Sequence, residues 1–342
     1  MTASVEVPES MRCSVLRTAG ELEVQERAVP RPGHREVLVR ISAVGTCGSD
    51  VHYFRHGRIG HFVVRDPLVL GHEPSGRIVA VGTGVDTTRI GQRVSLEPGV
   101  PCRRCRYCHT GAYNLCPDIT FFATPPVDGA FAEYVAIADD FAHPVPDHVS
   151  DDAAALLEPL SVAIWAHRRA GTGLGSRVLV AGAGPIGLLV AQVAAVQGAT
   201  EVLVIDPDPD RRALAGAFGA TAALDPAVDD PRDPDVDMDV DVFVDCSGAA
   251  PAVLGGLAAV RPGGVAVLVG MGADEMTLPV SALQSREITL TGTFRYANTW
   301  PAAVALAPSV DLDRLVTGHV DLDHVGDALS PDPAQVKVMV RP

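Results

Sequence analysis

The stretch VLVAGAGPIG, residues 178–187, constrains the fold of this chain more than any other segment. An apolar run typical of a buried strand leads into Gly182, Gly184 and Gly187, and an apolar helical pattern follows. Glycines at this spacing permit a tight turn, close approach of the backbone to a pyrophosphate, and dense packing of helix on strand. The segment therefore predicts the first strand, turn and helix of a dinucleotide-binding sheet.

Strand-like and helix-like segments alternate from residue 158 to residue 294. The runs RVLVAG, EVLVID, DVFVDC and GVAVLVG are strand candidates, and helical patterns separate them. This alternation predicts an α/β fold with a doubly wound parallel sheet. Residues 178–196 also lack charge over nineteen positions, which is the length of a membrane span, but three glycines and a proline interrupt them and favour strand, turn and buried helix.

Residues 1–157 show a different pattern. Short β-runs such as SVLRT, VLVRISAV and GRIVAVG are separated by Gly, Pro and Asp, which predicts a small barrel or sandwich. The chain of 342 residues exceeds the ~250–300 at which one hydrophobic core stops growing, so two domains are expected. After residue 294 a helix-like piece and a last strand, VKVMV, are expected to return to the first domain.

The formal net charge of −15 makes nucleic acid and anionic membranes poor partners, because both are bound through clustered Lys and Arg. A neutral or cationic ligand suits this charge better. The N-terminal residues show no basic start followed by an apolar run, so we expect no secretory signal and a cytoplasmic protein. In that reducing compartment the seven cysteines are expected to be metal ligands, catalytic groups or buried residues.

Four cysteines lie close together in CRRCRYCHTGAYNLC: Cys102, Cys105, Cys108 and Cys116. Four thiolates can surround one tetrahedral ion and leave no position for substrate, which predicts a structural zinc. An iron–sulfur cluster and cysteines without metal are the alternatives, although ferredoxin-type runs have a different fourth spacing.

A second set of potential ligands is divided between two segments. Cys47 lies in the loop GTCGSDVHY, and His72 and Glu73 are adjacent in GHEPSG, twenty-five residues further on. A thiolate, an imidazole and a carboxylate provide three protein ligands and leave a fourth position for water or substrate, as a catalytic zinc requires. The spacing alone leaves open both a catalytic metal and two turns without one.

The choice of dinucleotide depends on Asp206, which ends the strand EVLVID nineteen residues after Gly187. A carboxylate there can bind the hydroxyls of the adenosine ribose and repels a 2′-phosphate, so NAD is favoured over NADP. Arg211 is close in sequence and could stack on adenine or receive such a phosphate.

Residues 225–241 contain eight aspartates and three prolines. The D-x-D-x-D core resembles a calcium loop, but Val240 and Cys246 stand where such a loop requires Gly and Glu. A solvated crossover loop is therefore expected, with calcium as the alternative.

Several longer segments resemble the zinc-dependent medium-chain dehydrogenases, and within them the polyol branch of sorbitol (L-iditol) and xylitol dehydrogenases. The similarity extends over nearly the whole chain and is carried by GTCGSDVHYFRHGRIG, PLVLGHEPSG, FFATPPVDGAFAEY, LLEPLSVAIWAHRRAG, AGAGPIGL and FRYANTWP. FFATPP, LLEPLSVAIW and FRYANTWP separate polyol dehydrogenases from ordinary alcohol dehydrogenases.

The resemblance implies a domain plan. A GroES-like β-barrel catalytic domain would occupy residues 1–157 and carry the structural-zinc lobe at residues 98–117. A Rossmann NAD-binding domain would follow over residues 158–294, and residues 295–342 would return to the catalytic domain.

The same resemblance implies roles for the metal-side residues. Cys47, His72 and Glu73 would bind the catalytic zinc, and Glu158 would hold the zinc-bound water or the substrate. Asp50 would orient His72 and fix its tautomer. Glu158 at the start of a helix could instead only favour the positive end of the helix dipole.

Ser49 and His52 would relay the proton of the alcohol to solvent, with the cofactor ribose between them. The implied substrate-binding residues are Tyr53, Phe122, Thr124, Glu158, Arg295 and Tyr296. The implied cofactor-binding residues are Gly182, Gly184, Pro185, Ile186, Gly187, Asp206, Arg211, Val269, Met271, Thr293 and Arg295. Alternative roles stay open for Tyr53 and Phe122 as core aromatics, for Thr124 as a turn cap and for His52 as a surface residue.

These observations lead to one hypothesis: zinc-dependent oxidation of a secondary alcohol of a polyol to a ketose, with hydride transfer to NAD⁺. The alternatives are a zinc alcohol or L-threonine dehydrogenase of the same fold, and a catalytically silent NAD-binding zinc protein. The resemblance also implies a homo-oligomer, a tetramer or dimer, in which the edge strand near EITLTGT could form the contact.

Overall fold

The chain folds into two compact units. The computed structural model describes residues 7–233, 235–236, 238–330, 332 and 335–342. The first unit contains Met1–Glu158 and Leu312–Pro342, and the second contains Pro159–Asp311. Each unit has its own hydrophobic core, as a chain of this length requires.

The return to the first unit begins at Leu312, later than the residue 295 expected from the sequence. Helix α9 (Trp300–Leu306) belongs to the second unit, where Trp300 is fully buried and lies 5.4 Å from the ring of Tyr296. The amide of Asp311 donates a 2.6 Å hydrogen bond to Gln192 of the same unit. Contacts between residues distant in sequence therefore keep this segment in the second unit.

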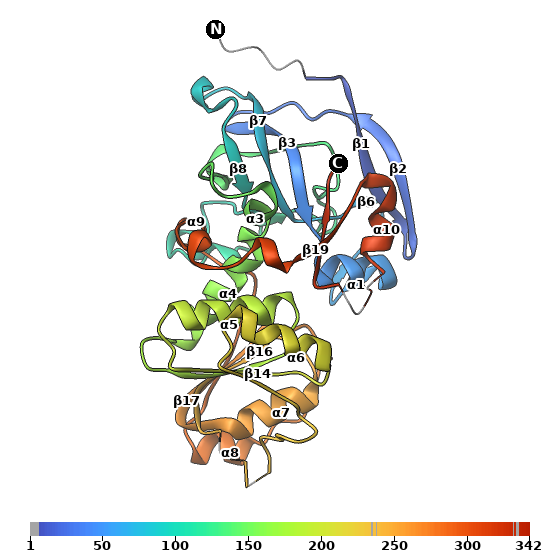
Figure 1. The fold of residues 1–342 in the computed structure, drawn as a ribbon. Helices are drawn as coiled ribbons and strands as arrows, with labels where there is room; N and C mark the ends of the chain where they lie inside the picture. The colour runs from blue at the N-terminus through green and yellow to red at the C-terminus, as the bar shows by residue number, and fades with distance from the viewer. Residues whose placement is uncertain (1–6, 234, 237, 331, 333–334) are drawn as a thin grey trace. The chain divides into compact units, whose positions relative to one another are not determined.

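The first unit is mainly β-structure (Figure 1). Its strands are β1 (Ser10–Thr18), β2 (Glu21–Ala28), β3 (Glu36–Gly45), β4 (Arg58–Ile59), β5 (Phe62–Val63), β6 (Leu68–Val69), β7 (Glu73–Val81), β8 (Arg93–Leu96), β9 (Gly99–Val100), β10 (Thr120–Phe121), β11 (Tyr134–Ala138), β12 (Ala142–Pro144), β19 (Val316–Val320) and β20 (Lys337–Val340). Its helices are α1 (Gly48–His56), α2 (Arg106–His109), α3 (Asp151–Ala155) and α10 (Val325–Ala328), with short 3-10 turns between elements.

Strand β3 is central to this unit. The largest sheet has the order β12–β8–β7–β3–β20–β19, and β11 also pairs with β3. At the end of β3, Gly45 lies opposite Glu73 of β7 on one side and Met339 of β20 on the other. The C-terminal strand is thereby placed beside the segment that follows β3.

The second unit contains a six-stranded parallel sheet of order β15–β14–β13–β16–β17–β18. The strands are β13 (Arg177–Ala181), β14 (Glu201–Ile205), β15 (Ala222–Leu224), β16 (Val240–Asp245), β17 (Val260–Leu268) and β18 (Thr289–Gly292). The helices are α4 (Leu157–Ala170), which begins at the boundary of the units, α5 (Pro185–Val196), α6 (Pro209–Ala215), α7 (Ala250–Ala259), α8 (Val280–Ser285) and α9. This order is that of a doubly wound dinucleotide-binding sheet, as predicted.

Helices cover both faces of this sheet: Figure 1 shows α5 on one face and α7 on the other. The predicted strand, turn and helix at residues 178–196 are confirmed as β13 and α5, so the uncharged run is divided between two elements. Among the described residues no helix is both long enough and apolar enough to cross a bilayer.

The acidic segment 225–241 is a crossover loop over most of its described length, and residues 234 and 237 lie outside the description. Its aspartates bond neighbouring amides and pair with arginines: Arg212 contacts Asp225 at 2.7 Å, and Arg232 contacts Asp230 at 2.6 Å. None of its described residues belongs to a group of three potential metal ligands. Over its described residues the segment is therefore the expected crossover loop.

Two neighbouring glycines of α7 give a matched test of the packing in the second unit. A Cβ on Gly256 would lie 2.1 Å from Cζ of the fully buried Phe243, whereas one on Gly255 would lie 3.5 Å from Pro231. We expect Gly256→Ala to destabilise the fold by about 1–3 kcal/mol through overpacking. Gly255→Ala should be neutral or stabilising by up to about 1 kcal/mol, because alanine favours the helix.

Chemical denaturation of both variants and the parent protein measures the difference. A Gly256→Ala protein as stable as Gly255→Ala would contradict the packing described for α7 on the sheet.

Candidate functional site

The segment expected as a loop around Cys47 is a helix, α1. Cys47 is its N-cap, and its amide donates a 3.0 Å hydrogen bond to the Asp50 carboxylate. That bond satisfies an amide at the start of the helix and explains why α1 forms despite Gly48. Ser49 and His52 are three residues apart and therefore share one face of α1, with His52 exposed.

Cys47, His72 and Glu73 come together in the first unit. Their potential ligand atoms all lie within 4.8 Å of one another. Pairing of β3 with β7 places Glu73 opposite Gly45, two residues before Cys47, and His72 directly precedes β7. The chemistry of this donor set, one sulfur, one nitrogen and one oxygen, fits a divalent ion such as Zn²⁺ with a remaining open position.

Asp50 connects the two segments that supply these groups. Its Oδ2 accepts from the amide of Cys47, and its Oδ1 accepts from the amide of Gly71 at 3.0 Å. The same Oδ1 lies 3.5 Å from Nδ1 of His72. The fully buried Asp50 therefore lies beside the imidazole that the resemblance expects it to orient.

The local charge favours a cation. Burial alone would lower the pKa of His72, but the negative groups of Asp50 and Cys47 raise it well above its ordinary value. The environment that favours a proton on this imidazole would equally favour a metal ion bound to its nitrogen.

Lys337 is a residue of this site that the sequence reasoning missed. Its ammonium is 2.7 Å from Oε1 and 2.6 Å from Oε2 of Glu73, and only the first contact has hydrogen-bond geometry. Both side chains are buried, with 4% of Lys337 and 1% of Glu73 exposed. One sequence signal could have found it: Lys337 is the only lysine among the 27 lysine and arginine residues.

Glu158 is also buried, with 5% of its surface exposed, near the start of α4. Its negative charge is one of those that raise the pKa of Lys337 above its ordinary value, against the effect of burial. Glu158, Glu73 and Lys337 therefore interact electrostatically within the first unit.

The four cysteines of the predicted lobe form the second group of potential ligands among the described residues. The Sγ atoms of Cys102, Cys105, Cys108 and Cys116 lie within 4.8 Å of one another. The amide of Arg104 lowers the pKa of Cys102 to about 7, whereas desolvation raises that of Cys108 to about 12. Four clustered sulfurs fit one tetrahedral ion, which would stabilise all four as thiolates.

A buried polar network attaches this lobe to the barrel sheet. Glu97, 3% exposed, accepts a 2.5 Å hydrogen bond from the hydroxyl of Tyr113 in the lobe and lies 2.9 Å from Nε2 of His143 on β12. Movement of the lobe would remove the Tyr113 hydroxyl from this buried carboxylate, so the hydrogen bond helps to fix the position of the lobe.

The predicted cofactor residues lie in the second unit, next to the carboxyl ends of its strands. Gly182 follows β13 with φ of 96°, and a Cβ on Gly187 would lie 1.8 Å from the carbonyl oxygen of Gly182. Gly184 is the N-cap of α5, with Pro185 in its first turn. Gly182 and Gly187 therefore require glycine, whereas a Cβ on Gly184 would meet open space within 4 Å. This turn leaves the helix N-terminus open to a pyrophosphate.

Asp206 follows β14 and is 5% exposed. One of its oxygens accepts from the amide of Ala183 at 2.7 Å and the other from the amide of Asp208 at 2.8 Å. These bonds fix the carboxylate beside the glycine turn. The side chain of Arg211 is exposed on α6, 3.9 Å from Asp208.

The remaining cofactor candidates follow the same edge of the sheet. Val269 and Met271 follow β17, and Thr293 follows β18, with its hydroxyl 3.3 Å from the carbonyl oxygen of Leu268. Ile186 lies in the first turn of α5.

The substrate candidates are divided between the two units. Tyr53 is 4% exposed and belongs to the core cluster of the first unit, and Phe122 packs against that cluster, so both contribute to packing. Thr124 precedes the cis-bonded pair Pro125–Pro126. Arg295 and Tyr296 lie in the second unit, with the Arg295 guanidinium 4.8 Å from the ring centroid of Phe294.

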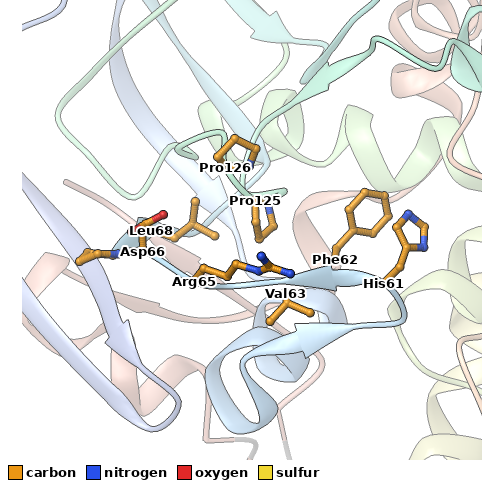
Figure 2. Close-up of a pocket in the computed structure, with 9 residues that line it drawn as sticks. His61, Phe62, Val63, Arg65, Asp66, Leu68, Pro125 and Pro126 are labelled. Carbon is orange, nitrogen blue, oxygen red and sulfur yellow. The ribbon is translucent and has the colours of Figure 1, made fainter.

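A cavity of about 230 Å³ lies in the first unit between the β4–β5 hairpin and the Pro125–Pro126 segment (Figure 2). Its walls are His61, Phe62, Val63, Arg65, Asp66, Pro67, Leu68, Pro125 and Pro126. None of the predicted site residues lines it. The cavity is therefore separate from the Cys47 group.

The two ligand groups should bind metal differently. We expect two equivalents of zinc per chain, of which a competing chelator removes first the one bound by Cys47, His72 and Glu73, because an open site exchanges more readily than a closed one. Cys47→Ser should lose one equivalent with little change in melting temperature. Cys105→Ser should lose the other and be destabilised, since the lobe depends on its metal.

Metal analysis and thermal melting of the two variants provide the measurement. A Cys105→Ser protein with unchanged melting temperature would refute the structural role of the lobe metal.

Comparison with known proteins agrees with this arrangement. The family described as "Alcohol dehydrogenase GroES-like domain" matches residues 33–147, and "Zinc-binding dehydrogenase" matches residues 185–309. Sorbitol dehydrogenase of Gallus gallus is 42% identical over 92% of this chain and 91% of its own length. Sorbitol dehydrogenase of Bacillus subtilis is 42% identical over 94% of each chain.

A solved structure gives the same result for the fold. L-idonate 5-dehydrogenase from Escherichia coli superposes with a TM-score of 0.91 and 30% identity, covering 97% of this chain and 98% of that one. The fold class expected from the sequence, a GroES-like β-barrel with a Rossmann sheet, is confirmed. The chain belongs to the zinc-dependent medium-chain dehydrogenases, in their sorbitol and xylitol dehydrogenase-like polyol branch.

Proposed function

We propose that the protein oxidises a secondary alcohol of a polyol to a ketose with NAD⁺ and zinc. The observation that carries this proposal is the convergence of Cys47, His72 and Glu73 in the first unit, with Asp50 behind His72. The family and its sorbitol dehydrogenase members support the same reaction class.

Zinc at the Cys47 group would supply Lewis-acid polarisation of the substrate oxygen. The residues of the chain then have separate tasks. Glu158, buried beside Lys337, would orient the substrate hydroxyl, and Asp50 would hold His72 in one tautomer. Ser49 and His52, on one face of α1, would move the hydroxyl proton towards solvent, because His52 is exposed.

The alcohol and NAD⁺ are the only reactants that this oxidation requires. The alcohol loses a hydride from its carbinol carbon to NAD⁺ and a proton through Ser49 and His52, which leaves a ketone, NADH and a proton. We assign the substrate side to Tyr53, Phe122, Thr124, Arg295 and Tyr296. Each of these side chains offers a hydroxyl, a charge or an aromatic face to a hydroxyl-rich ligand.

NAD⁺ is the proposed cofactor because of Asp206. Its carboxylate is fixed next to the glycine turn, where it would accept from the ribose hydroxyls and repel a 2′-phosphate. The glycine turn with Pro185 and Ile186 would bind the pyrophosphate, and Val269, Met271, Thr293 and Arg295 would contact the rest of the dinucleotide. Arg211 would stack on the adenine, since its side chain is exposed near the same turn.

The proposal extends to the assembly and the location of the protein. The parallel sheet ends at β18, so a second copy could pair with that edge and form a homo-oligomer, a dimer or tetramer. A cytoplasmic enzyme acting on a small-molecule substrate, without nucleic acid or membrane partners, agrees with the proposed chemistry.

A panel of alcohols tests the reaction. With NAD⁺, sorbitol, xylitol or iditol should give the highest kcat/KM, and a chelator should abolish turnover. Formation of NADH is followed by its absorbance, and Cys47→Ser is the control expected to lack the metal. Faster oxidation of ethanol or L-threonine would identify an alcohol or threonine dehydrogenase. NADH binding by metal-replete protein without turnover of any alcohol would identify a silent relative.

Two neighbouring aspartates test the choice of cofactor. Asp206→Asn should lower kcat/KM for NAD⁺ about 10–100-fold, because it removes charge-assisted hydrogen bonds to the ribose. The ratio of NAD⁺ to NADP⁺ use should fall as well, since the repulsion of a 2′-phosphate is lost. Asp208→Asn is the matched control: Asp208 caps α6 and should leave the ratio unchanged. An unchanged ratio in Asp206→Asn would show that this carboxylate does not select the cofactor.

A further inference from the structure

Lys337 is unusual both in sequence and in position. The chain contains 27 lysine and arginine residues, and Lys337 is the only lysine among them. Lys337 is the first residue of β20, and 4% of it is exposed. Among the described residues no arginine is buried to this extent. A buried ammonium requires a specific reason, because desolvation of a charge costs free energy.

The three N–H donors of this ammonium have three oxygen neighbours. Nζ donates to Oε1 of Glu73 at 2.7 Å and to the carbonyl oxygen of Thr46 at 2.7 Å, and Oε2 of Glu73 lies 2.6 Å away. Thr46 itself is bound to β20, because its amide and its hydroxyl both donate to the carbonyl oxygen of Val338 at 3.0 Å. The ammonium therefore bridges Glu73 and the residue directly before Cys47.

The side chains of Lys337 and Glu73 meet next to Gly45, at the end of β3, where there is no side chain in the way. A Cβ on Gly45 would lie 2.0 Å from Oε2 of Glu73 and 3.1 Å from Cε of Lys337. Gly45, like Val44, is a residue of β3 that pairs with both β7 and β20. Strands β3, β7 and β20 therefore meet at this ion pair, and a side chain at position 45 would collide with it.

Stability alone does not account for the pair. A buried ion pair is often no better for stability than apolar side chains of the same volume. The ammonium instead contacts the Glu73 carboxylate, and the negative charges of Glu73, Cys47 and Glu158 all raise the pKa of Lys337 against the effect of burial. It thus compensates charge where the proposed ligands gather.

We propose that Lys337 is a positioning residue for the metal site: its ammonium holds the Glu73 carboxylate in the orientation in which it can bind the ion together with Cys47 and His72. It acts through Glu73 and does not contact the substrate. The inference rests on the proposed role of Glu73 as a metal ligand. Loss of a group that orients a ligand typically lowers metal affinity about 10–100-fold.

The single lysine makes a direct test possible. Full-length protein grown on ¹³C,¹⁵N-labelled lysine contains one labelled side chain, so its Cε and Nζ resonances belong to Lys337. Zinc added to metal-free protein should shift these resonances with the equivalent that fills the Cys47 group, and the shift should be absent in Cys47→Ser. Unchanged Lys337 resonances in wild-type protein shown by metal analysis to hold both equivalents would overturn the proposal.

A double-mutant cycle measures the coupling to Glu73. Cobalt affinity and the visible cobalt spectrum are compared for wild type, Lys337→Met, Glu73→Gln and the double variant. We expect Lys337→Met to lower affinity 10–100-fold and to change the cobalt bands, but to have little further effect in the Glu73→Gln background. Wild-type affinity in Lys337→Met, or an equal loss in both backgrounds, would refute a role through Glu73.

The outcomes separate this inference from the proposed function. Full cobalt affinity in Glu73→Gln would refute the ligand role of Glu73 itself, and the positioning role with it. Reduced affinity in Glu73→Gln together with an unaffected Lys337→Met would refute the positioning role alone. If the unpaired carboxylate prevents Lys337→Met from folding, the lysine resonances of the wild-type protein decide the question.

Discussion

The site of the first unit depends on burying several negative groups at one place. Asp50, Glu73 and Glu158 are each at most 5% exposed, and Cys47 is close to two of them. Anions removed from water cost several kcal/mol each unless a cation or hydrogen-bond donors compensate them. Backbone amides satisfy Asp50, and Lys337 satisfies part of Glu73. The remaining charge provides the physical reason for a metal ion beside His72.

The two ligand groups differ in how the chain assembles them. The four cysteines lie within fifteen residues, so local turns are enough to bring them together. The Cys47 group instead requires β3, β7 and the C-terminal strand β20 to pair in register, because Gly45 stands opposite Glu73 and Met339 at once. The three ligands of the Cys47 group are thus held by paired strands of a sheet, whereas the four cysteines of the lobe are held by turns. This agrees with a structural role for one group and a catalytic role for the other.

Much of the fold could be predicted from local patterns. The alternation of apolar runs predicted the parallel sheet, and the cysteine spacing predicted the lobe, because both signals lie within short segments. Helix α1 was missed since its nine residues carry no clear apolar period, and the Cys47–Asp50 bond that begins it involves only a side chain and an amide. The return was expected at residue 295 and lies at Leu312, because Asp311 is bound to Gln192, a contact between residues distant in sequence that no local pattern predicts. The roles of Ser49, His52 and the substrate-side residues stay predictions.

Lys337 shows why a candidate site can be incomplete when ligands are sought by residue type. A lysine binds no zinc at neutral pH, so a search for cysteine, histidine and carboxylates passes over it. Its contacts nevertheless distinguish it from an arginine at the same place. The compact ammonium donates to two oxygens, Oε1 of Glu73 and the carbonyl oxygen of Thr46, whereas a planar guanidinium brings five donors and would leave more of them unpaired in a buried position. In a chain that otherwise uses arginine, the one lysine is therefore informative, because size and donor number favour it here while charge alone does not.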